Sequence, residues 1–206
     1  NFGMEFVKEF AIFLYKNNII KFGNFTLASG KNSPYYIDLR LVPSYPHQFR
    51  KMIKNLQNLI DKKTGLENFD ALVSVPTGGL VIASALAIET VKPLIYVRNK
   101  SKEHGTSKLI EGKLSSNMKL VMIDDVATTG NSILNGIKQI QEAGSIISES
   151  YVIVNRLENA NKLMDSVGVK LYQLTDILEI TKILFEERLI DEEILEKIKK
   201  QIDQAS

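Results

Sequence analysis

Apolar and polar positions along the chain follow two different periods in turn. Short, mostly apolar runs, typical of strands buried on both faces, alternate with segments whose apolar residues recur every three or four positions, typical of amphipathic helices. The strand-like runs are 71–75, 94–97, 120–123, 150–154 and 170–174, and the helix-like segments are 46–63, 81–90, 132–143, 159–167, 177–185 and 192–204. This alternation predicts an α/β fold, a doubly wound parallel sheet with ligands bound at the carboxyl ends of its strands.

A separate small unit precedes the alternating pattern. Residues 5–17 have helical spacing, and residues 25–27 and 35–39 predict two short strands. The link between these strands, Ser29 to Pro34, is a turn by its Gly, Ser, Asn and Pro content. On composition alone this hairpin is a structural unit, with Tyr35 and Tyr36 assigned to packing.

Composition restricts the classes of function. The 206 residues fit one domain, and 26 basic against 24 acidic residues argue against a protein that coats nucleic acid or a membrane surface. The chain has no cysteine, which excludes disulfides, zinc–thiolate sites and cysteine nucleophiles. We expect neither a transmembrane span nor a signal peptide, and therefore a cytoplasmic location.

The stretch from Lys119 to Ser132 carries the strongest chemical signal. An apolar run is followed by Asp124 and Asp125, a loop of small residues (127–130) and the start of a helix. Such a loop lets backbone N–H groups approach a phosphate, and a helix N-terminus adds free donors and partial positive charge. The carboxylates suit sugar hydroxyls or a hydrated metal ion, so the stretch suggests a site for a ribose 5-phosphate. The alternative is an ordinary strand-to-helix turn with an acidic helix cap.

Three further places carry candidate chemistry, each with a structural alternative. The turn 76–80 offers backbone donors at a helix start, or is only a connection between strand and helix. Residues 98–112 are polar and rich in cations, which suits a polyanion or a solvated surface, and we expect a mobile loop. Arg156, at the end of a strand, is placed to bind a carboxylate or to pair with Glu158 on the surface.

Three of these stretches resemble known motifs. The stretch 120–132 is similar to the phosphoribosyl-diphosphate (PRPP) motif of type I phosphoribosyltransferases: an apolar run, two acids, two small residues and Thr-Gly. The pattern F-T-L-x-S-G-x-x-S-P-Y-Y at 25–36 and the pattern R-x-x-x-K-x-H-G at 98–105 resemble the N-terminal signature and the catalytic loop of orotate phosphoribosyltransferases. The sequence departs from the bacterial pattern at Ala28 and Asn99, where basic residues are usual; Lys31 and Lys100 are candidates to replace them.

The resemblance implies a reaction and an organisation. It implies that orotate and PRPP give orotidine 5′-monophosphate and pyrophosphate in pyrimidine (UMP) biosynthesis, with Mg²⁺ as cofactor. It implies a single domain over 1–206, with a small N-terminal hood (residues about 1–40) and a mobile catalytic loop (about 98–113). It also implies a homodimer whose loop reaches the partner's site, with no nucleic-acid or membrane partner.

The resemblance also assigns roles to residues. Lys102, Asp124 and Asp125 are expected to be catalytic. The expected orotate contacts are Tyr35, Tyr36, Thr128 and Arg156. No side chain is expected to hold magnesium directly, because the ion would come with PRPP and water. The expected PRPP contacts are Thr77, Gly78, Arg98, Lys102, His104, Asp124, Asp125, Val126, Ala127, Thr128, Thr129, Gly130, Asn131 and Ser132.

Two other functions remain open at this point. One is a type I phosphoribosyltransferase that acts on a purine base, against which the hood signature and Arg156 argue. The other is a non-catalytic PRPP-sensing regulator of transcription. The sequence shows no helix-turn-helix segment, and sensing would not need the basic loop.

Overall fold

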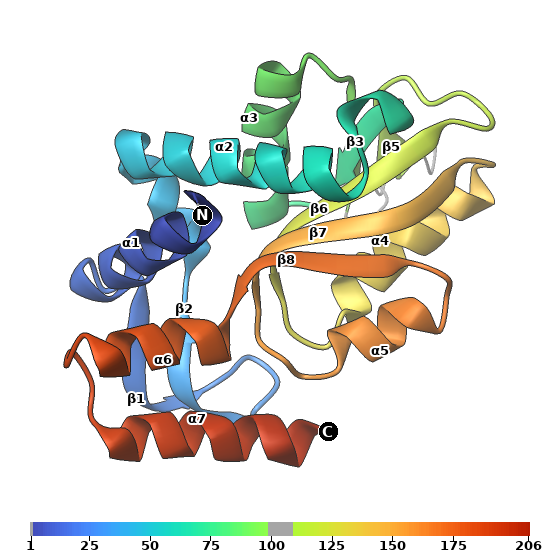
Figure 1. The fold of residues 1–206 in the computed structure, drawn as a ribbon. Helices are drawn as coiled ribbons and strands as arrows, with labels where there is room; N and C mark the ends of the chain where they lie inside the picture. Colours follow the sequence, from blue (N-terminus) through green and yellow to red (C-terminus); the bar gives the residue numbers. More distant parts are fainter. Residues whose placement is uncertain (1, 99–108) are drawn as a thin grey trace.

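A six-stranded sheet forms the centre of the molecule (Figure 1). The structure is a computed structural model that describes residues 2–98 and 109–206. The strands lie in the order β5–β4–β3–β6–β7–β8, all parallel to their neighbours except β5, which is antiparallel to β4. Their bounds are β3 Ala71–Ser74, β4 Leu94–Val97, β5 Ile110–Glu111, β6 Lys119–Ala127, β7 Ile146–Asn155 and β8 Lys170–Asp176.

Helices cover both faces of this sheet, as the alternating pattern predicts. Helices α2 (Pro46–Lys63) and α3 (Gly78–Thr90) cover one face, and α4 (Asn131–Glu142) and α5 (Ala160–Asp165) cover the other (Figure 1). Alternate strand residues enter two separate cores: Leu72 and Val121 pack on the α2–α3 side, and Val73 and Met122 on the α4–α5 side. The doubly wound fold is therefore confirmed, and burial on both faces explains the continuous apolar runs of the central strands β3 and β6.

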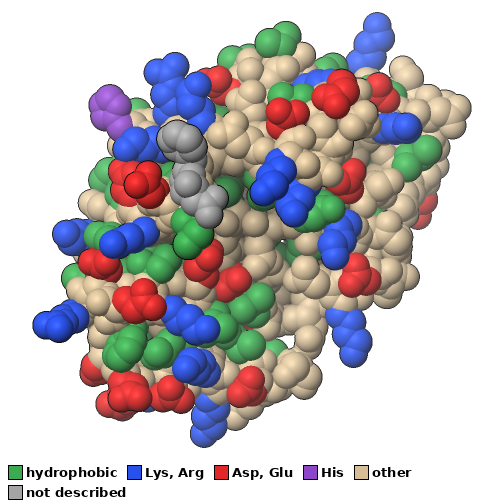
Figure 2. All heavy atoms as spheres, viewed as in Figure 1, with side chains coloured by type: hydrophobic (Ala, Val, Ile, Leu, Met, Phe, Trp, Pro, Cys, Tyr) green, Lys and Arg blue, Asp and Glu red, His purple; other side chains and the backbone are tan. Residues whose placement is uncertain are grey.

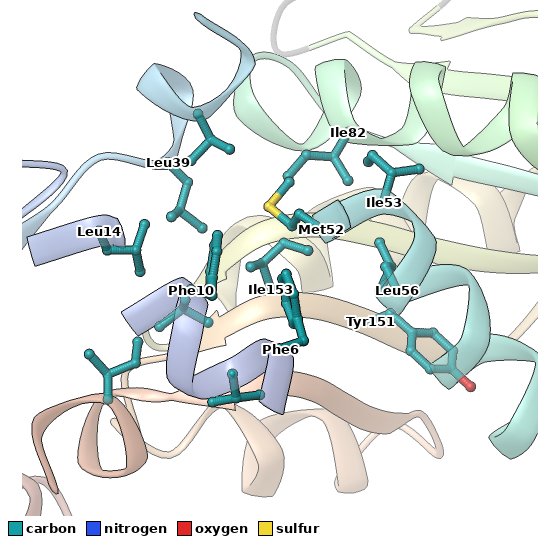
Figure 3. Close-up of a cluster of buried hydrophobic side chains, with 14 of the residues drawn as sticks. Phe6, Phe10, Leu14, Leu39, Met52, Ile53, Leu56, Ile82, Tyr151 and Ile153 are labelled. Carbon is teal, nitrogen blue, oxygen red and sulfur yellow. The ribbon is translucent and has the colours of Figure 1, made fainter. Parts of the chain in front are cut away.

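The N-terminal elements share the first of these cores. Figure 3 shows Phe6, Phe10 and Leu14 of α1 (Phe2–Lys16) in the same cluster as Met52 and Leu56 of α2. Strands β1 (Ile20–Thr26) and β2 (Asn32–Ile37) form a separate antiparallel hairpin. Two C-terminal helices, α6 (Ile177–Glu186) and α7 (Glu192–Ala205), pack against α1 and β2 respectively. Short 3₁₀ helices occupy Leu39–Ser44 and Leu66–Asn68.

Several of the helix and strand boundaries predicted from the sequence are wrong. Strand β6 does not end before the acidic pair, because its pairing with β7 continues to Ala127. Helix α3 begins at Gly78 rather than at residue 81, and β1 begins at Ile20 rather than at residue 25. Strand β5 lies inside the segment expected to be a loop, where its two residues pair with the end of β4.

The strand order places a topological reversal between the two central strands, β3 and β6. The chain leaves β3 through α3 toward β4, and leaves the neighbouring β6 through α4 toward β7, in the opposite direction. Open α/β sheets bind ligands beyond the carboxyl ends of the strands at such a reversal. Figure 2 shows acidic and basic side chains mixed over the visible face, in line with the small net charge of +2. None of the described helices is long and apolar enough to cross a membrane.

Candidate active site

A cleft of about 490 Å³ lies at this reversal. The hood hairpin and the residues after it form one wall, and the turns that follow β3 and β6 form another. The N-terminal signature at 25–36 and the PRPP-like stretch at 120–132 therefore line the same cleft. Its polar lining includes Ser29, Tyr36, Asp38, Arg40, Thr77, Asp125, Thr128 and Arg156.

The acidic pair lies inside strand β6, so its two side chains have different surroundings. Asp125 is half-buried and lines the cleft, whereas Asp124 is 8% exposed and does not belong to the lining. Each carboxylate accepts the next backbone N–H: Asp124 Oδ1 from Asp125 at 2.8 Å, and Asp125 Oδ1 from Val126 at 2.9 Å. Burial raises the pKa of Asp124 well above its usual range, and the neighbouring charge of Asp125 raises it further. Of the two carboxylates, Asp125 is therefore the one that the cleft exposes to a ligand.

Two glycines make room for these carboxylates. A Cβ atom on Gly78 would lie 2.7 Å from Asp125 Cγ and closer still to its Oδ2. A Cβ atom on Gly79 would lie 2.6 Å from Asp124 Oδ1 and 3.0 Å from its Cα. The turn 76–80 is thus more than a connection, because its glycines let the start of α3 approach the acidic pair.

Two helix starts present backbone donors near the acidic pair. Helix α3 follows Thr77, and α4 follows Gly130, whose φ of 89° lies in the left-handed region that favours glycine. At neither start does a side chain of the N-cap residue accept a hydrogen bond from a backbone N–H of the helix. Thr128 and Thr129 before α4 are exposed, as are Asn131 and Ser132 in its first turn. This arrangement suits an anion bound by N–H groups and hydroxyls.

Arg156 lies at the hood end of the cleft, just beyond β7. Its guanidinium carbon is 4.1 Å from the centre of the Tyr35 ring, and its Nε donates to Glu158 Oε2 at 2.9 Å. Its Nη2 donates to Ser33 Oγ at 3.2 Å. Arg156 is only 5% exposed, so the pair with Glu158 exists but is buried rather than on the surface.

The aromatic pair of the hood is divided between core and cleft. Tyr35 is fully buried beneath Arg156, and burial raises its pKa. Tyr36 is 38% exposed and lines the cleft. The structure therefore brings Tyr36, Thr128 and Arg156 together, while Tyr35 contacts the site through Arg156.

The basic segment is only partly described. Arg98 is half-buried and its Nη1 donates to Glu111 Oε1 at 3.2 Å. It lines a separate hollow of about 330 Å³ that Ser132 also lines. Lys102 and His104, two further predicted PRPP contacts, lie outside the described residues.

Two residues of the site carried no signal in the sequence. Asp38 and Arg40 line the cleft, where Arg40 Nε donates to Asp38 Oδ1 at 2.7 Å.

Among residues 2–98 and 109–206, no group of three or more acidic or histidine side chains is placed to hold a metal ion. The carboxylate oxygens of Asp125, which lines the cleft, fit a hydrated magnesium ion that arrives with a ligand.

Comparisons with known proteins bear on this geometry. Residues 45–178 match the family model of the phosphoribosyl transferase domain. An orotate phosphoribosyltransferase of Cenarchaeum symbiosum is 44% identical over 195 residues, which cover 95% of this chain and 98% of that protein. The chain belongs to the orotate phosphoribosyltransferase family. A solved orotate phosphoribosyltransferase of Aeropyrum pernix is 32% identical, with a TM-score of 0.76, over 88% of this chain and 99% of that one.

A longer solved protein has the same fold. The Leishmania donovani UMP synthase is 28% identical with a TM-score of 0.84, and the match covers 96% of this chain. The chain spans only 42% of that protein's length. These orotate phosphoribosyltransferase relatives agree with the fold class predicted from the alternating pattern.

Proposed function

We propose that the chain transfers the phosphoribosyl group of PRPP to orotate, giving orotidine 5′-monophosphate and pyrophosphate in pyrimidine biosynthesis. The observation that carries this proposal is the composition of one cleft. Thr128 and Asp125, beside two uncapped helix starts, line the same cleft as Arg156, a buried arginine at its hood end. The first group suits a ribose phosphate, and the second suits a planar base with a carboxylate.

In this proposal the start of α4 holds the 5-phosphate. The N–H groups and hydroxyls of Thr128 to Ser132 bind its oxygens, while Asp125 accepts hydrogen bonds from the ribose hydroxyls. Asp124, bonded to the Asp125 N–H, positions that residue. The Thr77–Gly78 turn at the start of α3 binds the pyrophosphate through backbone N–H groups.

Orotate lies at the hood end of the cleft. Its carboxylate binds the guanidinium of Arg156, whose planar geometry is supported by the Tyr35 ring beneath it. The Tyr36 side chain contacts the pyrimidine, with Thr128 beside it. This placement brings the base nitrogen toward C1 of the ribose, so much of the catalysis is positioning.

The remaining residues act on charges that develop on the ribose and on pyrophosphate during the reaction. As pyrophosphate leaves, the ribose becomes positive and the leaving group more negative, so carboxylates near the ribose and cations near the pyrophosphate both stabilise the transition state. Asp125 supplies the first kind of charge, and Lys102, Arg98 and His104 the second. Magnesium, when bound with PRPP, neutralises the same phosphates. The segment 98–113 excludes water that would hydrolyse the activated sugar.

The proposal includes a cytoplasmic homodimer in which the segment 98–113 reaches the partner's site. An apolar surface supports the dimer: on α3, Val81 is 41% and Ile88 is 81% exposed, and Val91, directly after the helix, is 88% exposed. A second copy of the chain would bury these side chains.

A panel of bases tests the proposed function. Orotate, uracil, hypoxanthine and adenine are each incubated with the protein, PRPP and magnesium, with Asp125→Asn as the inactive control. We expect turnover with orotate and little with the other three bases. Turnover with a purine instead would contradict the orotate site. PRPP binding without turnover of any base would indicate a sensor rather than an enzyme.

A further inference from the structure

A buried carboxylate behind Arg156 is shared by two cations. Glu158 Oε2 accepts from Arg156 Nε at 2.9 Å, and Glu158 Oε1 accepts from Lys31 Nζ at 3.1 Å. The side chains of Arg156 and Glu158 are 6% and 5% exposed, whereas that of Lys31 is 54% exposed. The cluster therefore extends from the interior to the surface, with its acid in the middle.

The charges of this cluster affect any anion that enters the cleft. Arg156 and Glu158 alone form a neutral buried pair, so a ligand carboxylate near Arg156 would also be repelled by Glu158 at close range. In a poorly solvated site this repulsion is only weakly screened. Lys31 binds the other oxygen of Glu158 and returns the cluster to a net charge of +1.

Lys31 is also connected to the cleft through the backbone. It precedes β2 in the hood turn, and its carbonyl accepts the N–H of Leu27 at 2.8 Å. Leu27, Ala28 and Ser29 of the same turn line the cleft beside Arg156. The hood turn therefore both lines the cleft and, through Lys31, contacts Glu158. These two residues are 127 positions apart in sequence.

We propose that Lys31 is a specificity-determining residue of the base site. By binding Glu158, it leaves the positive charge of Arg156 for the carboxylate of the pyrimidine. Lys31 acts through Glu158 and Arg156, so it is a positioning residue rather than a catalytic one. This inference rests on the proposed function, because it requires a ligand whose carboxylate meets Arg156.

A purely structural role of Lys31 would have a different consequence for ligand binding. If Lys31 only held the hood in place, its loss would weaken every nucleotide that the hood covers, with or without a carboxylate. Orotidine 5′-monophosphate and uridine 5′-monophosphate differ only in the carboxylate, so this pair of ligands separates the two roles.

The test measures dissociation constants of both nucleotides, by calorimetry, for the wild type and for Lys31→Met. We expect orotidine 5′-monophosphate to bind about 3- to 10-fold more weakly to the variant, the range for one partly solvated charge that acts through Glu158 and Arg156. Uridine 5′-monophosphate and PRPP should change less than about twofold. Lys31→Arg should restore the wild-type affinity because it keeps the charge.

An exposed ion pair away from the cleft provides a matched control. Lys51 is 52% exposed and binds the exposed Glu9 at 2.8 Å, so Lys51→Met removes a similar ion pair without touching the cleft. It should leave both affinities unchanged. Equal losses for the two nucleotides in Lys31→Met, or no loss for either, would overturn the inference. A wild type that binds both nucleotides equally would overturn the proposed orotate site, and the inference with it.

Discussion

The close approach of Gly78 to Asp125 leads to a quantitative prediction for Gly78→Ala. The added Cβ would lie 2.7 Å from Asp125 Cγ, about 0.7 Å inside the 3.4 Å at which ordinary contact begins. Asp125 is a side chain at the edge of a cleft, so its carboxylate can rotate away at the cost of its hydrogen bond from the Val126 N–H. The variant should therefore fold, with a loss in unfolding free energy of about 1 kcal/mol.

The displaced carboxylate should lose its function all the same. A misplacement of about 1 Å in a positioning group can cost on the order of 100-fold in rate. We expect kcat/KM for PRPP, measured by loss of orotate absorbance, to fall by about that factor in Gly78→Ala. Gly3→Ala is a neutral control, because a Cβ there meets nothing within 4 Å.

Gly79→Ala provides a contrasting control. Its Cβ would meet Asp124 Cα at 3.0 Å and Ser74 Oγ at 2.8 Å, atoms that cannot move aside freely. Overpacking of this kind costs about 1–3 kcal/mol of stability. Wild-type kcat/KM in a folded Gly78→Ala would refute the reasoning. So would a loss of PRPP affinity from Gly78→Ala that is as large in an Asp125→Ala background as in the wild type, because the clash is then absent.

Three further predictions follow from the acidic pair and the basic segment. Because burial raises the pKa of Asp124, the folded chain binds that proton more tightly than the unfolded chain, so stability falls as pH rises above the ordinary carboxyl pKa of 3.8. Asp124→Asn should therefore be more stable than the wild type at about pH 7 and equal to it below about pH 4, in urea titrations; a less stable variant at neutral pH would contradict this. Lys102→Ala should lower kcat far more than it weakens PRPP binding, since it acts on charge that grows in the transition state; equal losses would argue against that role. Mixing Lys102→Ala with Asp125→Asn should restore about a quarter of the sites if dimers reassort and share their sites, and a mixture with only the summed parental activity, after confirmed subunit exchange, would exclude sharing.

The sequence was most informative where one local rule determines the structure. The apolar periods located the helix Pro46–Lys63 and the strand Leu94–Val97 at the bounds that the structure has. They also placed the two turns that form the cleft. Local periodicity suffices there because burial follows the pattern: α2 buries one apolar face, and β4 alternates half-buried and buried residues.

The sequence prediction gave the same role to adjacent residues whose side chains point to opposite sides of a strand. Asp124 and Asp125 were taken as a pair beyond a strand, and Tyr35 and Tyr36 as an aromatic pair. All four lie within strands, where successive side chains alternate, so one member of each pair is buried and the other lines the cleft. The contacts of Glu158 with Lys31 could not be predicted, because no local rule joins a hairpin turn to a distant loop.

The account's central claim is that one cleft holds the ribose phosphate at α4 and the pyrimidine at Arg156. A crystal structure with orotidine 5′-monophosphate bound tests it most directly. We expect the phosphate among the N–H groups of Thr128 to Ser132, the ribose hydroxyls at Asp125, and the orotate carboxylate about 2.7–3.2 Å from the Arg156 guanidinium. A phosphate bound away from the start of α4, or a base with its carboxylate turned away from Arg156, would contradict the account.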